Sequence, residues 1–438
     1  MDINNFKNSK DIDKDEELAL VGLDDLSPEK DFETENVEGG YIISKYTGSS
    51  EAVLIPSSIN GLPVVSISIY AFHDCENLQR IIIPDGVYSL GDRAPSSRVI
   101  RGLAGAFHGC KNLKSITLSA GVTDIGRWEF SNCVGLESIY VDADNASFCS
   151  VDGVLFNKEK TVLLKYPAGK DGNTYIIPDG VVTIGEHAFS ECRNLAAIAI
   201  PDSVAEIEIG AFQYCEILTD IHIPNSIEIG YCAFENCTSL KNITISDNNT
   251  MFSSENGVLF NKDKSVLIKY PEGRELECFF IPDSVSEIAS CAFWKCKALK
   301  SIVIPDKTSK IGHCVFTGCK GLLDITIPYG NIRIEDGSFQ GCSNLTNVTI
   351  PASVTEIGEF AFAGCTSLTS ITIPGDSIDF WPWSFLECTN LMSINIHAKR
   401  ERTIIGYQAF PEHTAINFIS NKIPTDDPAL LTQYPKNG

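Results

Sequence analysis

The sequence predicts a β-dominated α/β solenoid of about 12 turns, with a long parallel sheet, short second strands and single helical turns. Three segments recur in order: Ala-Phe-x-x-Cys, Leu-x-x-Ile-x-Ile-Pro and Val-x-x-Ile-Gly. Most copies are 22 or 23 residues apart, and the last interval is 25 residues. Three much longer intervals, two of 59 and one of 35 residues, indicate insertions into a 23-residue array. The recurring phenylalanine stands at Phe72, Phe107, Phe130, Phe189, Phe212, Phe234, Phe293, Phe316, Phe339, Phe362, Phe385 and Phe410.

The chain begins with an acidic segment. Residues 1–38 hold 13 Asp and Glu against 4 Lys, and the whole chain carries a net charge of −23. This composition predicts a disordered leader over residues 1–38. We expect residues 39–70 to form an N-terminal cap, residues 71–420 the repeat array and residues 421–438 a tail. The negative charge argues against nucleic acid and anionic membrane as partners.

One turn of the array can be read from residues 354–373. Ile371 and Ile373 alternate with polar residues, which predicts a strand with the isoleucines pointing inward. Residues 354–357 predict a second short strand, and the Ala-Phe-x-x-Cys segment is long enough for only one helical turn. Neighbouring turns are expected to stack their strands into one long parallel sheet.

Two positions in each turn favour glycine. Gly358 is expected to supply a bend, and Gly364 the left-handed residue that ends the helical turn. The first position recurs as Gly126, Gly185, Gly312 and Gly406, and the second as Gly318, Gly341, Asn132 and Asn236.

The 16 cysteines suggest disulfides at first. Eleven of them share one repeat position, however, and are expected to form a buried column of small side chains. Parallel, in-register side chains about 4.8 Å apart fit disulfide geometry poorly. Among the others, Cys291 and Cys314 share a register in adjacent turns and are the pair best placed to bond. The column contains Cys75, Cys110, Cys133, Cys192, Cys215, Cys237, Cys296, Cys319, Cys342, Cys365 and Cys388.

Two insertions, at about residues 142–177 and 246–281, resemble each other closely. Each places Val-Leu-Phe and Val-Leu-Leu/Ile-Lys-Tyr on either side of a short polar tip, which predicts a hairpin. The hairpins are interpreted either as modules inserted between turns or as protruding contact points. Their tips carry Lys158, Lys160, Lys262 and Lys264.

The repeated segments resemble the BspA-type leucine-rich repeat family over about residues 40–420. Residues 41–72 also look like the usual N-terminus of that family. The resemblance implies a leucine-rich repeat superhelix. It also implies a surface or secreted protein that acts in adhesion and protein binding, and it brings no catalytic motif.

We predict a non-catalytic protein-binding or adhesion scaffold that uses the exposed face of the solenoid. No phosphate loop, nucleophile elbow, zinc-protease motif or EF-hand loop occurs in the sequence. His73, Cys75, His108 and Cys110 do not make a metal site, because inward and outward positions would have to converge. We therefore assign no catalytic residue, metal or cofactor. The alternative is a structural spacer whose specificity lies in the N-terminal segment or in the inserted hairpins.

The expected partner is a protein, such as a host or matrix protein, and the chain is expected to be a monomer. The sequence shows no signal peptide and no transmembrane helix, which would place a full-length chain in the cytoplasm. The resemblance instead implies the cell surface or secretion, so both locations stay open.

Small polar side chains occupy the outward positions of the strands. They form either a β-favourable polar ladder or a broad, weakly charged binding face. Trp381 and Trp383 interrupt the Val-x-x-Ile-Gly pattern, and they either cap the C-terminal end or anchor a partner. The candidate binding face comprises Ser115, Thr117, Ser138, Tyr140, Asp220, His222, Asn242, Thr244, Asp324, Asn347, Thr349, Ser370 and Thr372.

Overall fold

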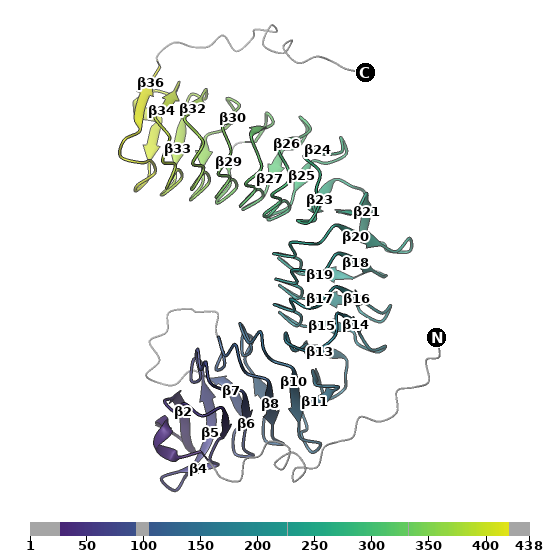
Figure 1. The fold of residues 1–438 in the computed structure, drawn as a ribbon. Coiled ribbons are helices and arrows are strands. Elements are labelled where there is room, and N and C mark those ends of the chain that lie inside the picture. Colours follow the sequence, from purple (N-terminus) through teal and green to yellow (C-terminus); the bar gives the residue numbers. More distant parts are fainter. Residues whose placement is uncertain (1–26, 93–104, 226, 332, 420–438) are drawn as a thin grey trace. The chain divides into compact units, whose positions relative to one another are not determined.

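The computed structural model describes residues 27–92, 105–225, 227–331 and 333–419. These residues form two units, an N-terminal unit (1–251) and a C-terminal unit (252–438), each described here by itself. Both are stacks of short parallel strands with almost no helix, which confirms the predicted solenoid (Figure 1). The stack has about 16 turns rather than 12. The predicted helical turns are single hydrogen-bonded turns, such as Cys192 N to Phe189 O at 3.3 Å.

The Leu-x-x-Ile-x-Ile segments form the long-strand ladder. The predicted long stack of parallel strands is confirmed, and hydrogen-bonded pairing divides this ladder into short parallel sheets of two to four strands. The strands have only three or four residues each, so a small departure in one turn interrupts the pairing. The ladder contains β3 (Ala52–Leu54), β6 (Arg80–Ile82), β8 (Ser115–Leu118), β10 (Ser138–Val141), β14 (Thr174–Ile176), β16 (Ala197–Ala199), β18 (Asp220–Ile223), β20 (Asn242–Ile245), β24 (Cys278–Phe280), β26 (Ser301–Val303), β28 (Asp324–Thr326), β30 (Asn347–Thr349), β32 (Ser370–Ile373), β34 (Ser393–Ile396) and β36 (Ala415–Phe418).

The Val-x-x-Ile segments form the short-strand ladder. Its strands also pair in parallel, for example Ile184 with Ile207 and Ile207 with Ile229. The ladder contains β5 (Leu62–Ser68), β7 (Ser89–Asp92), β9 (Asp124–Ile125), β13 (Val162–Lys165), β15 (Thr183–Ile184), β17 (Glu206–Ile207), β19 (Glu228–Ile229), β23 (Val266–Lys269), β25 (Glu287–Ile288), β27 (Lys310–Ile311), β29 (Arg333–Ile334), β31 (Glu356–Ile357), β33 (Ile378–Phe380) and β35 (Thr403–Ile405).

The N-terminal cap begins earlier than the sequence predicts. A 3₁₀ turn η1 (Glu29–Asp31) and strand β1 (Phe32–Val37) precede β2 (Gly40–Tyr46), with which β1 pairs antiparallel. The boundary of the predicted leader at residue 38 is therefore wrong. Phe32 is buried against Tyr46, at 5.4 Å between ring centroids, and this contact outweighs the acidic composition around it. Strand β4 (Ser58–Ile59) pairs with β5, a second 3₁₀ turn η2 (Arg400–Arg402) precedes β35, and residues 1–26 and the predicted tail at 421–438 lie outside the described residues.

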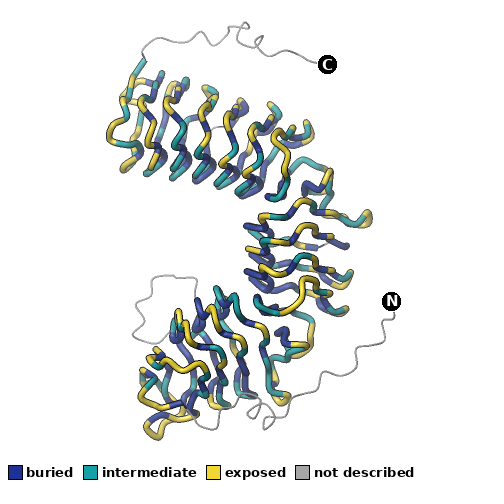
Figure 2. The backbone as a smooth tube through the Cα atoms, in the orientation of Figure 1, coloured by how far each residue is buried: buried dark blue, intermediate teal, exposed yellow. Residues whose placement is uncertain are grey.

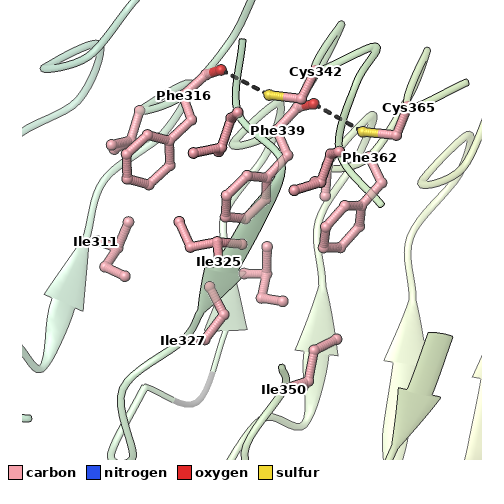
Figure 3. Packing of buried hydrophobic residues seen from close by; sticks show 14 of the residues in the cluster. Ile311, Phe316, Ile325, Ile327, Phe339, Cys342, Ile350, Phe362 and Cys365 are labelled. Carbon is pink, nitrogen blue, oxygen red and sulfur yellow. Dashed lines mark hydrogen bonds between the residues drawn. The ribbon is translucent and has the colours of Figure 1, made fainter. Parts of the chain in front are cut away.

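The core of each unit is a column of stacked phenylalanine rings. The Phe339 ring lies 5.3 Å from that of Phe316 and 5.1 Å from that of Phe362, centroid to centroid (Figure 3). Isoleucines of both ladders pack beneath the rings, so the inner side of each turn is buried while the loops are exposed (Figure 2). No turn could bury this surface alone, because each ring needs the neighbouring turns to cover its two faces.

The cysteine column is buried as predicted, except for the half-buried Cys75, and its thiols are also hydrogen-bond donors. Cys342 Sγ donates to the carbonyl oxygen of Phe316 at 3.1 Å, and Cys365 Sγ to that of Phe339 at 3.2 Å (Figure 3). The same bond, at 3.0–3.2 Å, recurs at Cys110, Cys133, Cys215, Cys237, Cys319 and Cys388. All 16 cysteines are free, so the pairing considered for Cys291 and Cys314 does not form.

The two glycine positions serve different purposes. Gly364 has a φ of 73°, and the equivalent Asn132 has a φ of 58°, so the predicted left-handed residue is confirmed. Gly358 does not have a positive φ. A Cβ atom there would lie 2.7 Å from the amide nitrogen of Asp336 in the preceding turn, so glycine is required by close backbone approach rather than by a special φ. The second left-handed residue of the corner is Phe360, with a φ of 54°.

Each insertion is a three-stranded meander rather than a simple hairpin. In the first, β11 (Phe148–Val151) pairs antiparallel with β12 (Val154–Asn157), which pairs antiparallel with β13. The second repeats this arrangement with β21 (Phe252–Glu255), β22 (Val258–Asn261) and β23. The last strand of each meander joins the short-strand ladder and leads to a tyrosine in the phenylalanine column. Tyr166 stacks on Phe189 at 5.2 Å, and Tyr270 on Phe293 at 5.1 Å, so each insertion contributes a further turn.

Lys165 compensates for a shortened corner in the first insertion. In ordinary turns four residues lie between the buried isoleucine and the column ring, as between Ile184 and Phe189. Only two residues lie between Leu163 and Tyr166. Backbone N–H groups that would bond to the next turn are therefore missing. The buried Lys165 ammonium donates to the carbonyl oxygen of Ser190 (3.3 Å), the position that accepts an amide of the preceding turn elsewhere, as from Glu191 N to Gln213 O. It also donates to the carbonyl oxygen of His187 (3.0 Å), which accepts Ser190 N as well.

We expect burial to protect most of the free thiols from alkylation in the folded protein. Burial raises the pKa of Cys133, Cys192 and Cys388 to about 12, which leaves almost no reactive thiolate at pH 8. Alkylation of the folded protein should label the exposed Cys278 first, whereas denaturation without reductant should expose all 16 thiols. Mass spectrometry counts the labels, and a denatured chain with six or more unlabelled cysteines would contradict the column of free thiols.

Replacement of Lys165 by methionine should destabilise the protein by about 1–3 kcal/mol, because the buried carbonyl of Ser190 loses its ammonium donor, whereas the carbonyl of His187 keeps its bond from Ser190 N. Lys160→Met, at an exposed turn, is the matched control and should change stability by less than about 0.5 kcal/mol. Urea denaturation followed by circular dichroism measures both. Equal stability of the two variants would show that the ammonium does not replace the missing amides.

Candidate binding face

The candidate face divides into exposed and covered parts. Seven of the predicted positions are exposed on β18, β28, β30 and β32, and an eighth lies on β20. The exposed residues are Asp220, His222, Thr244, Asp324, Asn347, Thr349, Ser370 and Thr372. The half-buried residues are Ser115, Ser138, Tyr140 and Asn242, and Thr117 is buried.

The N-terminal part of the predicted face is less exposed than the rest. Thr117 lies in register between Ile82 and Tyr140, whose larger side chains flank its hydroxyl. The first insertion also folds back onto this region, since Ile139 N donates to the carbonyl oxygen of Gly153 at 2.9 Å. The outward positions of β8 and β10 are therefore less exposed than predicted, because strand alternation alone cannot show that an insertion returns to this region.

Side chains on β18 and β20 are held in place by bonds along the ladder. Asn242 Nδ2 donates to Asp220 Oδ1 at 2.8 Å. The two ring nitrogens of His222 lie 3.0 Å from Thr244 Oγ1 and 3.0 Å from Ser246 Oγ. This ordered row of donors and acceptors is suited to hydrogen bonding with a partner at little further entropic cost.

In the C-terminal unit, register separates two threonines that the sequence suggests are neighbours. Thr349 pairs with Thr326, whereas Thr372 pairs with Asn395, because β30 and β32 belong to different short sheets. Both threonines are nevertheless exposed. They belong to one face but do not form a cross-strand pair.

The sequence analysis missed apolar side chains on the same face. Phe280 is 69% exposed and pairs in register with Val303, which is 49% exposed. Ile176 is also exposed, at the equivalent strand position of the N-terminal unit. The signal was present, since Phe280 occupies the outward position in Glu-Cys-Phe-Phe-Ile-Pro. The predicted face was restricted to polar outward positions, so Phe280 and Val303 were left out.

The lysines at the meander tips are less free than the sequence suggests. Lys158 Nζ donates to the carbonyl oxygen of Ala143 at 3.1 Å, and Lys264 pairs with Glu255 at 2.6 Å. These bonds fold the two side chains back onto the protein. They weaken the case for the tips as protruding contact points.

The histidines and tryptophans singled out in the sequence pack against neighbouring turns of the solenoid. The His73 and His108 rings stack at 5.2 Å, whereas Cys110 points inward to bond with Phe72 O.

Trp383 stacks on Phe360 at 5.2 Å and is followed by a further turn, so its interpretation as the terminal cap is wrong. Trp381 is 44% exposed, with the Arg333 guanidinium 5.0 Å from its ring centroid. In the described ranges, no three His, Cys, Asp or Glu side chains converge as a metal site.

The described part of the chain contains no helix with the length and apolarity needed to cross a bilayer.

Comparisons with known proteins support the repeat assignment. The model for the BspA type leucine rich repeat region matches in several copies, at residues 45–104, 65–160, 169–273, 270–391 and 310–425. No curated protein matches the sequence.

Solved structures provide three similar chains. The pneumococcal vaccine antigen PcpA is 22% identical, with 88% of this chain and 90% of that chain covered and a TM-score of 0.52, which shows a shared fold. A leucine rich cell surface protein from Faecalibacterium prausnitzii is 26% identical (91% and 96% covered, TM-score 0.49). A leucine-rich repeat protein from Bacteroides ovatus is 27% identical (91% and 100% covered, TM-score 0.41).

Proposed function

Because this chain belongs to the BspA-type leucine-rich repeat family, we propose that it is a non-catalytic scaffold that binds a protein partner through the long-strand face of its C-terminal unit. Proteins of this family generally serve as protein-binding or adhesion scaffolds. The observation that carries the proposal is the exposed row on β24 to β32, where apolar Phe280 and Val303 lie at one end and small polar side chains follow.

The composition of this face suits a protein partner. Phe280 leaves a large apolar surface in water, and burial of aromatic rings supplies much of the binding energy at protein interfaces. Asn347, Thr349, Ser370 and Thr372 can bond to a partner without the desolvation cost of charged groups. Asp324 is the one charged member among the five predicted residues of this unit. A host or matrix protein, met by a monomer at the cell surface or after secretion, is the partner that we propose.

Lysine at both Thr349 and Thr372 should abolish partner binding while the melting temperature hardly changes. Both positions are exposed, so the two substitutions should cost less than about 1 kcal/mol in total. The added bulk and charge fall within the proposed contact surface. Binding is measured by surface plasmon resonance against immobilised host matrix proteins and by adhesion to host cells, and stability by circular dichroism.

Two controls make this result specific. Asn344→Lys with Ala352→Lys adds the same charge on exposed loops at either end of β30 and should leave binding intact. Phe280→Ser should weaken binding without any change of charge. If binding survives the lysines but fails when Lys158, Lys160, Lys262 and Lys264 become serine, the insertions carry the function and the proposed face is wrong.

A further inference from the structure

The shortened corner in the first insertion leaves a cleft within the N-terminal unit. The flanking turns keep the full corner, at residues 125–130 and 184–189, whereas the turn between them lacks two residues. The resulting cleft has a volume of about 580 Å³. This lies within the ~300–1,000 Å³ typical of ligand pockets. Its apolar wall includes Ile125, Leu164, Ile207 and Ile229.

Two rings lie inside this cleft, one from each flanking corner. The Trp128 and His187 ring centroids are 3.7 Å apart, with the ring planes at 37°. The His187 side chain is only 8% exposed, yet neither of its ring nitrogens has a hydrogen-bond partner. Its Nε2 lies 3.9 Å from Glu186 Oε1, beyond hydrogen-bonding distance. Buried polar groups in proteins are almost always bonded, and no described protein group bonds this imidazole, so the ring is open to a ligand in the cleft.

The imidazole is neutral at physiological pH. Burial, with a smaller contribution from the Lys165 charge, lowers the pKa of His187 to about 4. A neutral ring presents one acceptor nitrogen and one N–H donor and does not repel a cation. Lys165 is not available to a ligand in the same way, because its ammonium already bonds to the carbonyl oxygens of His187 and Ser190.

The rim of the cleft is acidic. Glu206 and Glu228 are register partners on adjacent strands, about 4.8 Å apart, and among the described residues neither side chain forms an ion pair. Glu186 and Glu208 add two more carboxylates. The one exposed cation is Arg127, which is 77% exposed and lies 3.2 Å from Glu186. Such exposed pairs contribute about 1 kcal/mol or less, so a ligand can displace Arg127 at little cost.

The same ladder positions in the C-terminal unit behave differently. Glu287 pairs with Lys310 at 2.6 Å, and Glu356 with Arg333 at 3.1 Å. Each of these two carboxylates therefore has a basic register partner, although Glu356 also pairs with Asp379 on its other side. Glu206 has no basic register partner, because it pairs with Thr183 and Glu228. Adjacent like charges destabilise a parallel pair, and a bound cation would relieve that repulsion.

We propose that the cleft binds an arginine side chain presented by a protein or peptide. The guanidinium stacks on Trp128, donates to the carboxylates of Glu186 and Glu208, and satisfies the acceptor nitrogen of His187. Glu206 and Glu228 provide the surrounding negative potential. Arginine fits better than lysine because its planar group combines ring stacking with paired hydrogen bonds. This site is separate from the proposed face of the C-terminal unit, and either can fail without the other.

Isothermal titration of the full chain with acetyl-Gly-Arg-Gly-amide tests the proposal. The citrulline peptide, which has nearly the same shape and no charge, should bind at least tenfold more weakly. Arginine binding should weaken as salt is raised, because exposed carboxylates contribute to it. No saturable heat with the arginine peptide, or equal affinity for citrulline, would overturn the proposal. Equal affinity for the lysine peptide would overturn the assignment to a guanidinium group.

Substitutions in the cleft test whether the arginine peptide binds there. Glu206→Gln with Glu228→Gln should lower arginine affinity about tenfold and flatten its salt dependence, whereas Trp128→Leu should lower affinity without flattening that dependence. Glu287→Gln with Glu356→Gln makes the same charge change in the C-terminal unit and should leave affinity unchanged. Circular dichroism checks that every variant folds. If only the control pair weakens binding, the arginine site lies elsewhere and the proposal is wrong.

Discussion

Every turn of this protein depends on the next turn for its backbone hydrogen bonds. Besides the two strand ladders, a third row of bonds joins the corners, as from Phe189 N to Ala211 O at 2.7 Å and from Phe339 N to Ala361 O at 2.7 Å. These bonds form only if equivalent residues have the same conformation in successive turns. The sequence must therefore repeat, and the Phe column, the Cys column and the left-handed corners are consequences of that single constraint.

The constraint explains which features could be predicted from sequence. Phe339 and Cys342 stand at positions where the same residue type recurs in most turns, so their burial follows directly from the repeat. The left-handed conformation of Gly364 is kept even where the equivalent residue is Asn132 or Glu191, so it follows from the repeated turn rather than from glycine alone. The thiol bond of Cys342 to Phe316 O could not be predicted, because small apolar residues would give the same burial pattern. The requirement for glycine at position 358 could not be predicted either, because its close approach to the Asp336 backbone depends on the spacing between turns.

Prediction was weakest where the repeat is interrupted. Tyr166 and Tyr270 occupy the phenylalanine column, but no Ala-Phe-x-x-Cys segment marks them, so two turns were read as parts of insertions. When Tyr166 is aligned with the column phenylalanines, the corner of its turn is two residues short, and Lys165 stands where most other turns have alanine. The covered position of Thr117 and the exposed Phe280 depend on neighbouring strands as well, and strand alternation alone could not rank them.

The bonding of each turn to its neighbours also determines how the protein would respond to force. A pull on one end of the chain breaks the bonds of the terminal turn first, because that turn is bonded to a neighbour on one side only. Each 23-residue turn that detaches would release about 75 Å of extended chain. The array would therefore lengthen in successive steps, each dissipating work, while the turns that are still stacked keep their binding surfaces intact.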